Sequence, residues 1–210
     1  MYLTHMKYIS DIVKDLQLRF VGRLLYLDFT RPDITYSVHL LSQFLQKPTQ
    51  SHFAAALHVV RYLKKTSGHG LFYSASADLA LTSFCDSDWA KCPLTSRSIT
   101  GYCVFLGGCL ISWKSKKQQT VSRSSPEAEY RSAANTVCEL KWRCYLLKDL
   151  QVLIALPIQL HCDKKSAITM IGNPVFHERT KYIEIDCHLI RDHYKAGFTT
   201  PTYIHTESIG

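Results

Sequence analysis

The spacing of apolar residues changes once along the chain, near residue 77, and the change divides the chain into two predicted parts. Over residues 30–46, apolar side chains recur every three or four positions, which is the period of an amphipathic helix. The same period returns over residues 51–66 and stops before Ser67-Gly68, a common helix-ending signal. Residues 1–76 are therefore predicted to be helical.

After residue 77 the apolar positions alternate, as they do in β-strands. Three short alternating runs occupy residues 79–86, 100–106 and 109–115, and Gly107-Gly108 between the last two predicts a tight hairpin. The remaining segments alternate in type: a helix at 125–150, a strand at 158–163, helices at 164–171 and 183–197, and a strand at 199–206. This order predicts one mixed five-stranded α/β sheet with flanking helices over residues 77–210.

The composition excludes several classes of protein. With 46% apolar and 20% charged residues, the chain is neither disordered nor collagen-like. No apolar run approaches the ~18 residues of a membrane span, and the start shows no signal-peptide pattern, so no membrane partner is expected. The eight cysteines show no Cys-x-x-Cys pair, which favours reduced thiols in an intracellular protein, with the compartment left open.

The net charge of +8 suits a polyanionic partner such as a nucleic acid. An excess of this size also occurs in proteins that bind none, so charge alone leaves the question open.

Acidic residues end two of the predicted strands. Asp86 closes the first, with Asp88 shortly after it, and Asp163 closes the fourth. Taken singly, Asp163 is also a suitable N-cap for the helix at 164–171, and Asp86 and Asp88 suit a solvated turn.

The long helix between these strands adds a third carboxylate. Its start is well defined by Ser124 as cap and Pro126 in the first turn. At 100° per residue, Glu129 falls on the apolar stripe with Ala133, whereas Glu127 falls on the opposite, solvent side. Because a charge on the inner face should be paired or should hold a metal, Glu129 is a candidate ligand.

Asp86, Glu129 and Asp163 together form an all-oxygen set, which Mg²⁺ or Mn²⁺ prefers. Clustered carboxylates holding two such ions are suited to in-line phosphoryl displacement. Asp88 is expected to shape the turn.

Several long blocks of the chain, in order, closely resemble the ribonuclease H domain of copia-type long-terminal-repeat retrotransposon Pol polyproteins, especially those of plants. The blocks are FCDSDWAKCP, SRSITGYCVFLGG, ISWKSKKQQTVSRSSPEAEY, LHCDKKSAI and NPVFHERTKYIEIDCHLIRD. Upstream, the stretch from Val21 resembles the end of the adjoining reverse transcriptase and its connection.

The resemblance implies a ribonuclease H-like fold over residues 77–210, preceded at 1–76 by a helical remnant of the reverse transcriptase. It implies metal-dependent hydrolysis of the RNA strand of RNA–DNA hybrids, within a larger Pol polyprotein. Residue by residue, Asp86, Glu129 and Asp163 match the catalytic, metal-binding carboxylates of that family. The alternative is a non-catalytic nucleic-acid-binding or decayed fragment that keeps the fold.

The chain departs from the family pattern at three places. Lys164 replaces the asparagine that usually follows the fourth-strand aspartate, and Lys91 replaces a glycine. The family's fourth carboxylate lies beyond the last residue given, so the domain is expected to stop before its last helix and its two-ion site to be incomplete.

Basic residues in two segments are candidates for binding the hybrid. Lys114, Lys116 and Lys117 follow the third strand and suit a phosphate track, although a solvated strand end explains them equally well. In the second segment, the resemblance suggests a groove-lining role for three residues, with an unliganded loop as the alternative: His177, Arg179 and Lys181.

Overall fold

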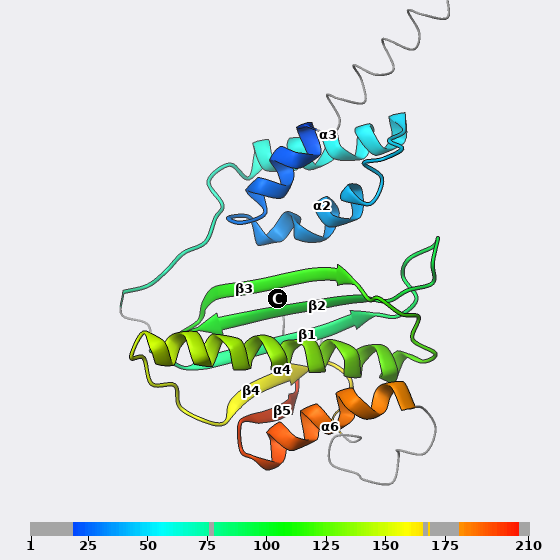
Figure 1. Ribbon diagram of the computed structural model, residues 1–210. Helices are drawn as coiled ribbons and strands as arrows, with labels where there is room; N and C mark the ends of the chain where they lie inside the picture. The colour runs from blue at the N-terminus through cyan, green and yellow to red at the C-terminus, as the bar shows by residue number, and fades with distance from the viewer. Residues whose placement is uncertain (1–18, 76–77, 166–167, 169–180, 206–210) are drawn as a thin grey trace, which may run out of the picture. The chain divides into compact units, whose positions relative to one another are not determined.

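Figure 1 shows the computed structural model of the protein, which describes residues 19–75, 78–165, 168 and 181–205, without the side chains of 181–184. The chain divides into two compact units, Met1–Leu71 and Phe72–Gly210, each with its own hydrophobic core. No helix within the described ranges is long and apolar enough to cross a membrane.

The first unit is built from helices. A helical stretch at 19–27 precedes the 3-10 helix η1 (Pro32–Ile34), α2 (Thr35–Ser42) and α3 (Gln50–Lys65). Thr49 caps α3, because its hydroxyl accepts a hydrogen bond from the backbone N–H of His52. The two helices predicted here are therefore present, with the first ending at Ser42 instead of residue 46. The stretch at 19–27, η1, α2 and α3 all contribute to the core of this unit, which contains Val21, Leu24, Ile34, Val38, Leu41, Ala56 and Val59.

Arg31 joins the start of η1 to the end of α3. Its side chain is 6% exposed, and its guanidinium donates to the Thr66 carbonyl at 2.9 Å and to the Asp33 carboxylate at 2.7 and 2.9 Å. The Tyr62 hydroxyl also donates to Asp33, at 2.8 Å. The hydrogen bond from Arg31 lowers the pKa of Asp33, so this buried cation is fully paired by charged and polar partners.

We expect Arg31→Leu to destabilise the first unit by about 1.5–3 kcal/mol, because hydrogen bonds to charged groups contribute about that much. Amide hydrogen exchange within α3 should accelerate by about 10- to 100-fold, while exchange in the second unit stays unchanged. Arg61→Leu is the control, since it removes the same charge from an exposed position of α3. Unchanged exchange in α3 of Arg31→Leu would contradict the assignment.

The second unit is built on one five-stranded sheet. Its order is β3-β2-β1-β4-β5. Strands β1, β2 and β3 pair antiparallel, whereas β4 pairs parallel with β1 and β5 parallel with β4. The sheet is therefore mixed, as predicted. The strand bounds are β1 Leu81–Asp88, β2 Ile99–Leu106, β3 Cys109–Lys117, β4 Ile158–Cys162 and β5 Thr199–Tyr203.

The hairpin between β2 and β3 turns at the glycine pair that predicted it. Gly107 and Gly108 both have positive φ, 58° and 74°, which side chains other than glycine rarely adopt. β1 runs two residues further than predicted, to Asp88, because it stays paired with β2 beyond Asp86.

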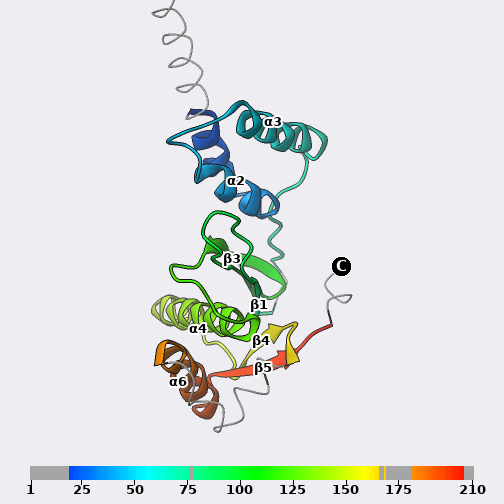
Figure 2. The ribbon, with the colours of Figure 1, turned by 90° about the vertical axis from the view of Figure 1, so that its right-hand side faces the viewer.

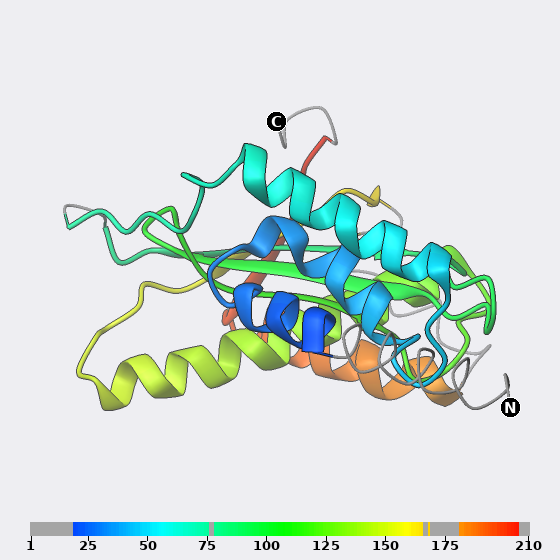
Figure 3. The ribbon, with the colours of Figure 1, turned by 90° about the horizontal axis from the view of Figure 1, so that it is seen from above.

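Helices α4 (Ser125–Asp149) and α6 (Lys181–Lys195) lie on the same face of the sheet (Figures 2 and 3). Strand β1 shows why: its alternate residues Leu81, Ser83, Cys85 and Ser87 are buried, and α4 packs on that face. Two clusters of apolar residues fill the space between helices and sheet. The mixed α/β sheet with flanking helices is confirmed, and the helix predicted at 164–171 falls largely outside the described residues.

Candidate metal centre

Two neighbouring parallel strands bring the strand-end aspartates together. Cys85 of β1 is in register with Cys162 of β4, so the next residues, Asp86 within β1 and Asp163 just after β4, lie at the same end of the sheet. Because parallel neighbours point the same way, the side chains of Asp86 and Asp163 reach one region. The sequence placed each at a strand end, and the pairing of β1 with β4 makes them adjacent.

Helix α4 adds the third carboxylate from above the sheet. The Ser124 hydroxyl accepts the N–H of Glu127 at 3.4 Å and fixes the start of the helix, and Glu129 lies in its second turn with 2% exposure. The Ser132 hydroxyl, one turn further, donates to the Asp86 carbonyl at 2.6 Å. This bond holds α4 against β1 at the level where Glu129 faces Asp86.

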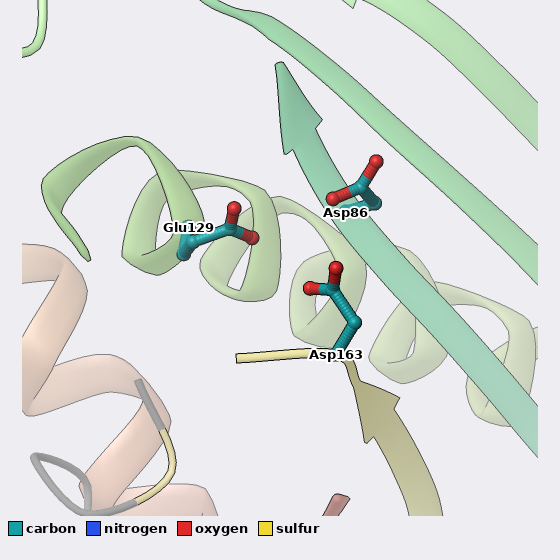
Figure 4. Close-up of side chains that lie close together, drawn as sticks. All are labelled: Asp86, Glu129 and Asp163. Carbon is teal, nitrogen blue, oxygen red and sulfur yellow. The ribbon is translucent and has the colours of Figure 1, made fainter. Parts of the chain in front are cut away.

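The three carboxylates converge (Figure 4). One oxygen each of Asp86, Glu129 and Asp163 lies within 4.8 Å of the others. Buried oxygens Oε2 of Glu129 and Oδ1 of Asp163 have no hydrogen-bond partner among the described residues. Buried carboxylate oxygens without donors are costly unless a cation meets them, and an all-oxygen set fits Mg²⁺ or Mn²⁺. The residues therefore fit a hard divalent ion.

Burial and mutual repulsion make the negative charge at this centre unfavourable. Desolvation raises the pKa of Glu129 to about 7, even though the hydrogen bond from Lys164 acts in the opposite direction. Partial burial and the charge of Asp163 raise the pKa of Asp86. A cluster of carboxylates with raised pKa values is a frequent mark of a functional site.

Lys164 reaches into the cluster. Its Nζ donates to Glu129 Oε1 at 2.7 Å, and the lysine side chain is 38% exposed where that of the glutamate is 2% exposed. Desolvation disfavours the charged ammonium, but the hydrogen bond to Glu129 and the charges of the carboxylates outweigh it and raise the pKa of Lys164. The chain thus supplies one cation of its own to the acidic centre.

Glu127 corrects one expectation. It points away from the three carboxylates but is not solvated, because its side chain is 5% exposed. Its carboxylate accepts hydrogen bonds from the Arg123 backbone N–H and from the Arg131 guanidinium, each at 2.8 Å. A helical wheel gives the direction of a side chain but not the loop that covers it, so this burial was not predictable from α4 alone.

The predicted substrate-binding residues divide into two sets. Lys114, Lys116 and Lys117 line one groove of about 420 Å³. His177 and Arg179 lie outside the described residues, as does the side chain of Lys181, so the structure says nothing of that segment.

Sequence reasoning missed two residues near these sites. Arg131 and Asn135 of α4 line the same groove as the lysines, and only their i, i+4 spacing on the helix hinted at it.

No protein-family model matches the chain. Among curated proteins, the chain is similar to the retrovirus-related Pol polyprotein from transposon RE1 of Arabidopsis thaliana, with 46% identity over 186 residues. It is also 38% identical over 173 residues to the polyprotein from transposon TNT 1-94 of Nicotiana tabacum. The alignments cover 89% and 82% of this chain but 13% of each polyprotein, so the chain spans a small segment of these relatives.

Among solved structures, the chain is similar to the foamy viral protease-reverse transcriptase dRH in complex with double-stranded DNA. The TM-score is 0.56 at 12% identity, and the match covers 89% of this chain and 31% of that chain. At 12% identity, the similarity shows a similar fold and nothing about function. The mixed five-stranded sheet with flanking helices agrees with the ribonuclease H-like fold expected from the sequence.

Proposed function

The chain belongs to the family of retrovirus-related Pol polyproteins of plant transposons, and we propose that its residues 77–210 act as a ribonuclease H domain that hydrolyses the RNA strand of RNA–DNA hybrids. Residues 1–76 would then be the end of the reverse transcriptase that precedes it in the polyprotein. The observation that carries the proposal is the convergence of Asp86, Glu129 and Asp163 within 4.8 Å at one end of the sheet.

Under this proposal, Asp86, Glu129 and Asp163 hold Mg²⁺ or Mn²⁺ at the attacked phosphate. Divalent ions bound there would neutralise the charge that develops on the phosphate and activate the attacking water. The protein's own part is to fix the three carboxylates: β1 and β4 hold the aspartates side by side, and the Ser132 hydrogen bond to the Asp86 carbonyl holds the helix carrying Glu129. A centre for two ions would need ligands beyond these three.

The basic groove gives the nucleic acid a second place of contact. Lys114 and Lys116 come from β3, Arg131 and Asn135 from α4, and together they present cations and amide donors in a hollow of about 420 Å³. Side chains of this kind bind backbone phosphates and position a duplex without reading its sequence. We assign this groove to the phosphates of the hybrid.

We expect Lys116→Gln to weaken hybrid binding and to reduce the slope of log K against log salt concentration by about 0.7–0.9, since one phosphate contact is lost. Binding would be followed by fluorescence anisotropy in EDTA, which prevents cleavage. Lys148→Gln removes the same charge from an exposed position in the last turn of α4 and should leave the slope unchanged. An unchanged slope for Lys116→Gln would show that the groove does not meet the hybrid.

A second candidate function is a nucleic-acid-binding domain without activity. The observation that favours it is Lys164, whose Nζ already pairs with the candidate ligand Glu129 at 2.7 Å. Such a domain would keep the fold and the basic groove and bind hybrids without cutting them.

Cleavage of an end-labelled RNA–DNA hybrid in Mg²⁺, with and without EDTA, distinguishes the two. Cutting of the RNA strand that EDTA abolishes supports the ribonuclease, and binding without cutting supports the second candidate. A duplex of DNA alone is the substrate control and should remain intact.

A further inference from the structure

Lys164 bonds one of the carboxylates that would hold a divalent ion. It follows the ligand candidate Asp163 directly, and its ammonium donates to Glu129 Oε1 at 2.7 Å. We propose that Lys164 competes with the divalent ion for the acidic centre, so that metal binding requires its side chain to leave Glu129 and turn to solvent. The inference rests on the proposed metal centre and concerns how readily that centre fills.

The Lys164 ammonium and a metal ion cannot both bind Glu129 Oε1. A magnesium ion needs carboxylate oxygens at about 2.1 Å, and Glu129 Oε1 is already engaged by a positive nitrogen at 2.7 Å. An ion on that oxygen would stand next to the ammonium, where two positive charges repel strongly at low local dielectric. Lys164 and a metal ion therefore do not share Glu129 Oε1.

Lys164 bonds only one oxygen of the carboxylate cluster. We therefore expect a divalent ion to displace Lys164, and do not expect Lys164 to prevent the ion from binding. Glu129 Oε2 and Asp163 Oδ1 stay buried without a donor among the described residues. One ammonium has a single charge and bonds one of these carboxylates, whereas a divalent ion can meet oxygens of all three. A divalent ion therefore interacts more favourably with the carboxylate cluster than the Lys164 ammonium does.

Lys164 can also leave at modest cost. Its side chain is 38% exposed, and the long aliphatic stem of lysine lets the head group reach water without a change in the backbone. The ammonium of the neighbouring Lys165 lies over the Tyr203 ring, 4.7 Å from the centroid. The two adjacent lysines therefore differ in their surroundings, and Lys164 is the one bonded to Glu129.

The test compares two substitutions that remove the same charge. Mg²⁺ is titrated by calorimetry into the chelator-stripped full chain, as wild type, Lys164→Gln and Lys165→Gln, at about pH 8.5, where protons compete least for the carboxylates. We expect Lys164→Gln to bind Mg²⁺ about tenfold more tightly than wild type, as expected when one hydrogen-bonded competitor is removed. Lys165→Gln removes the same charge from the neighbouring position, where the ammonium lies over the Tyr203 ring, and should bind Mg²⁺ like wild type.

The remaining variants make the outcome decisive. Lys164→Arg keeps a cation at the cluster and should not tighten binding, and Lys164→Met keeps the stem and replaces the glutamine variant if that one fails to fold by circular dichroism. Equal or weaker Mg²⁺ binding by Lys164→Gln overturns the inference while leaving the metal centre in place. If neither wild type nor any Lys164 variant binds Mg²⁺, both the inference and the proposed metal centre are overturned. If Lys165→Gln increases the Mg²⁺ affinity as much as Lys164→Gln does, the effect is one of net charge, and the inference is overturned.

Discussion

Asp86→Asn is expected to reduce Mg²⁺-dependent hydrolysis of an RNA–DNA hybrid by more than about 100-fold in kcat/KM. Loss of a group that merely supports a metal ligand already costs about 10- to 100-fold, and loss of the ligand itself should exceed that. The change is nearly isosteric, and Asp86 is an exposed residue near the end of β1, so the fold should be unaffected. Initial rates on a labelled hybrid, at saturating and at limiting Mg²⁺, measure the effect.

The matched control lies two residues away on the same strand. Asp88 is the last residue of β1, exposed, outside the carboxylate cluster, and paired at 3.7 Å with Lys91. Surface pairs of this kind contribute little, so Asp88→Asn should keep the rate within about twofold. Equal losses in Asp86→Asn and Asp88→Asn would mean that general negative charge at this edge, and not ligation by Asp86, supports the reaction.

Glu129→Gln is expected to stabilise the metal-free protein at about pH 8 by roughly 3 kcal/mol, although it should abolish the proposed hydrolysis. Glu129 is 2% exposed, and burial raises its pKa from 4.5 to about 7. Because the folded state binds this proton more tightly than the unfolded chain does, the glutamate's contribution to stability is lost as pH rises through about 7. A glutamine carries no charge there and can still accept the hydrogen bond from Lys164.

Urea unfolding in EDTA at about pH 5 and pH 8 measures this effect. The wild type should lose more stability between the two pH values than Glu129→Gln does, since only the wild type ionises the buried group. Added Mg²⁺ should then raise the melting temperature of the wild type more than that of the variant, because the ion binds only the folded cluster. A variant that follows the pH dependence of the wild type would contradict the raised pKa.

Glu127→Gln should have the opposite effect on stability and destabilise the protein. This glutamate, two residues earlier on α4 and 5% exposed, accepts hydrogen bonds from Arg123 and Arg131. Neutralising it weakens two charge-assisted bonds and leaves Arg131 without its charge partner, at a cost of about 1–3 kcal/mol. Opposite changes in the free energy of unfolding would show that the charge of Glu127 stabilises the fold, whereas the charge of Glu129 destabilises the metal-free protein.

Much of the fold was predictable because its determinants are local. Alternation in residues 79–115 specifies three strands, the Gly107-Gly108 pair specifies the hairpin that joins two of them, and Ser124 marks the start of the long helix. The inward face of α4 identified Glu129, and the strand ends identified Asp86 and Asp163. Each of these inferences needed only neighbours within a few residues or one helical period.

What the sequence determined by itself is therefore the order of the elements and the three acidic candidates. Only the tertiary structure decided what surrounds those candidates: β1 beside β4, which brings Asp86 to Asp163, and Lys164 against Glu129, 35 residues away in the chain. Burial and pairing depend on groups far apart in sequence, and a periodic pattern contains no information about which distant residues meet. For that reason the sequence could name the carboxylates of the centre, while their partners and the energetic consequences of burial came from the packing.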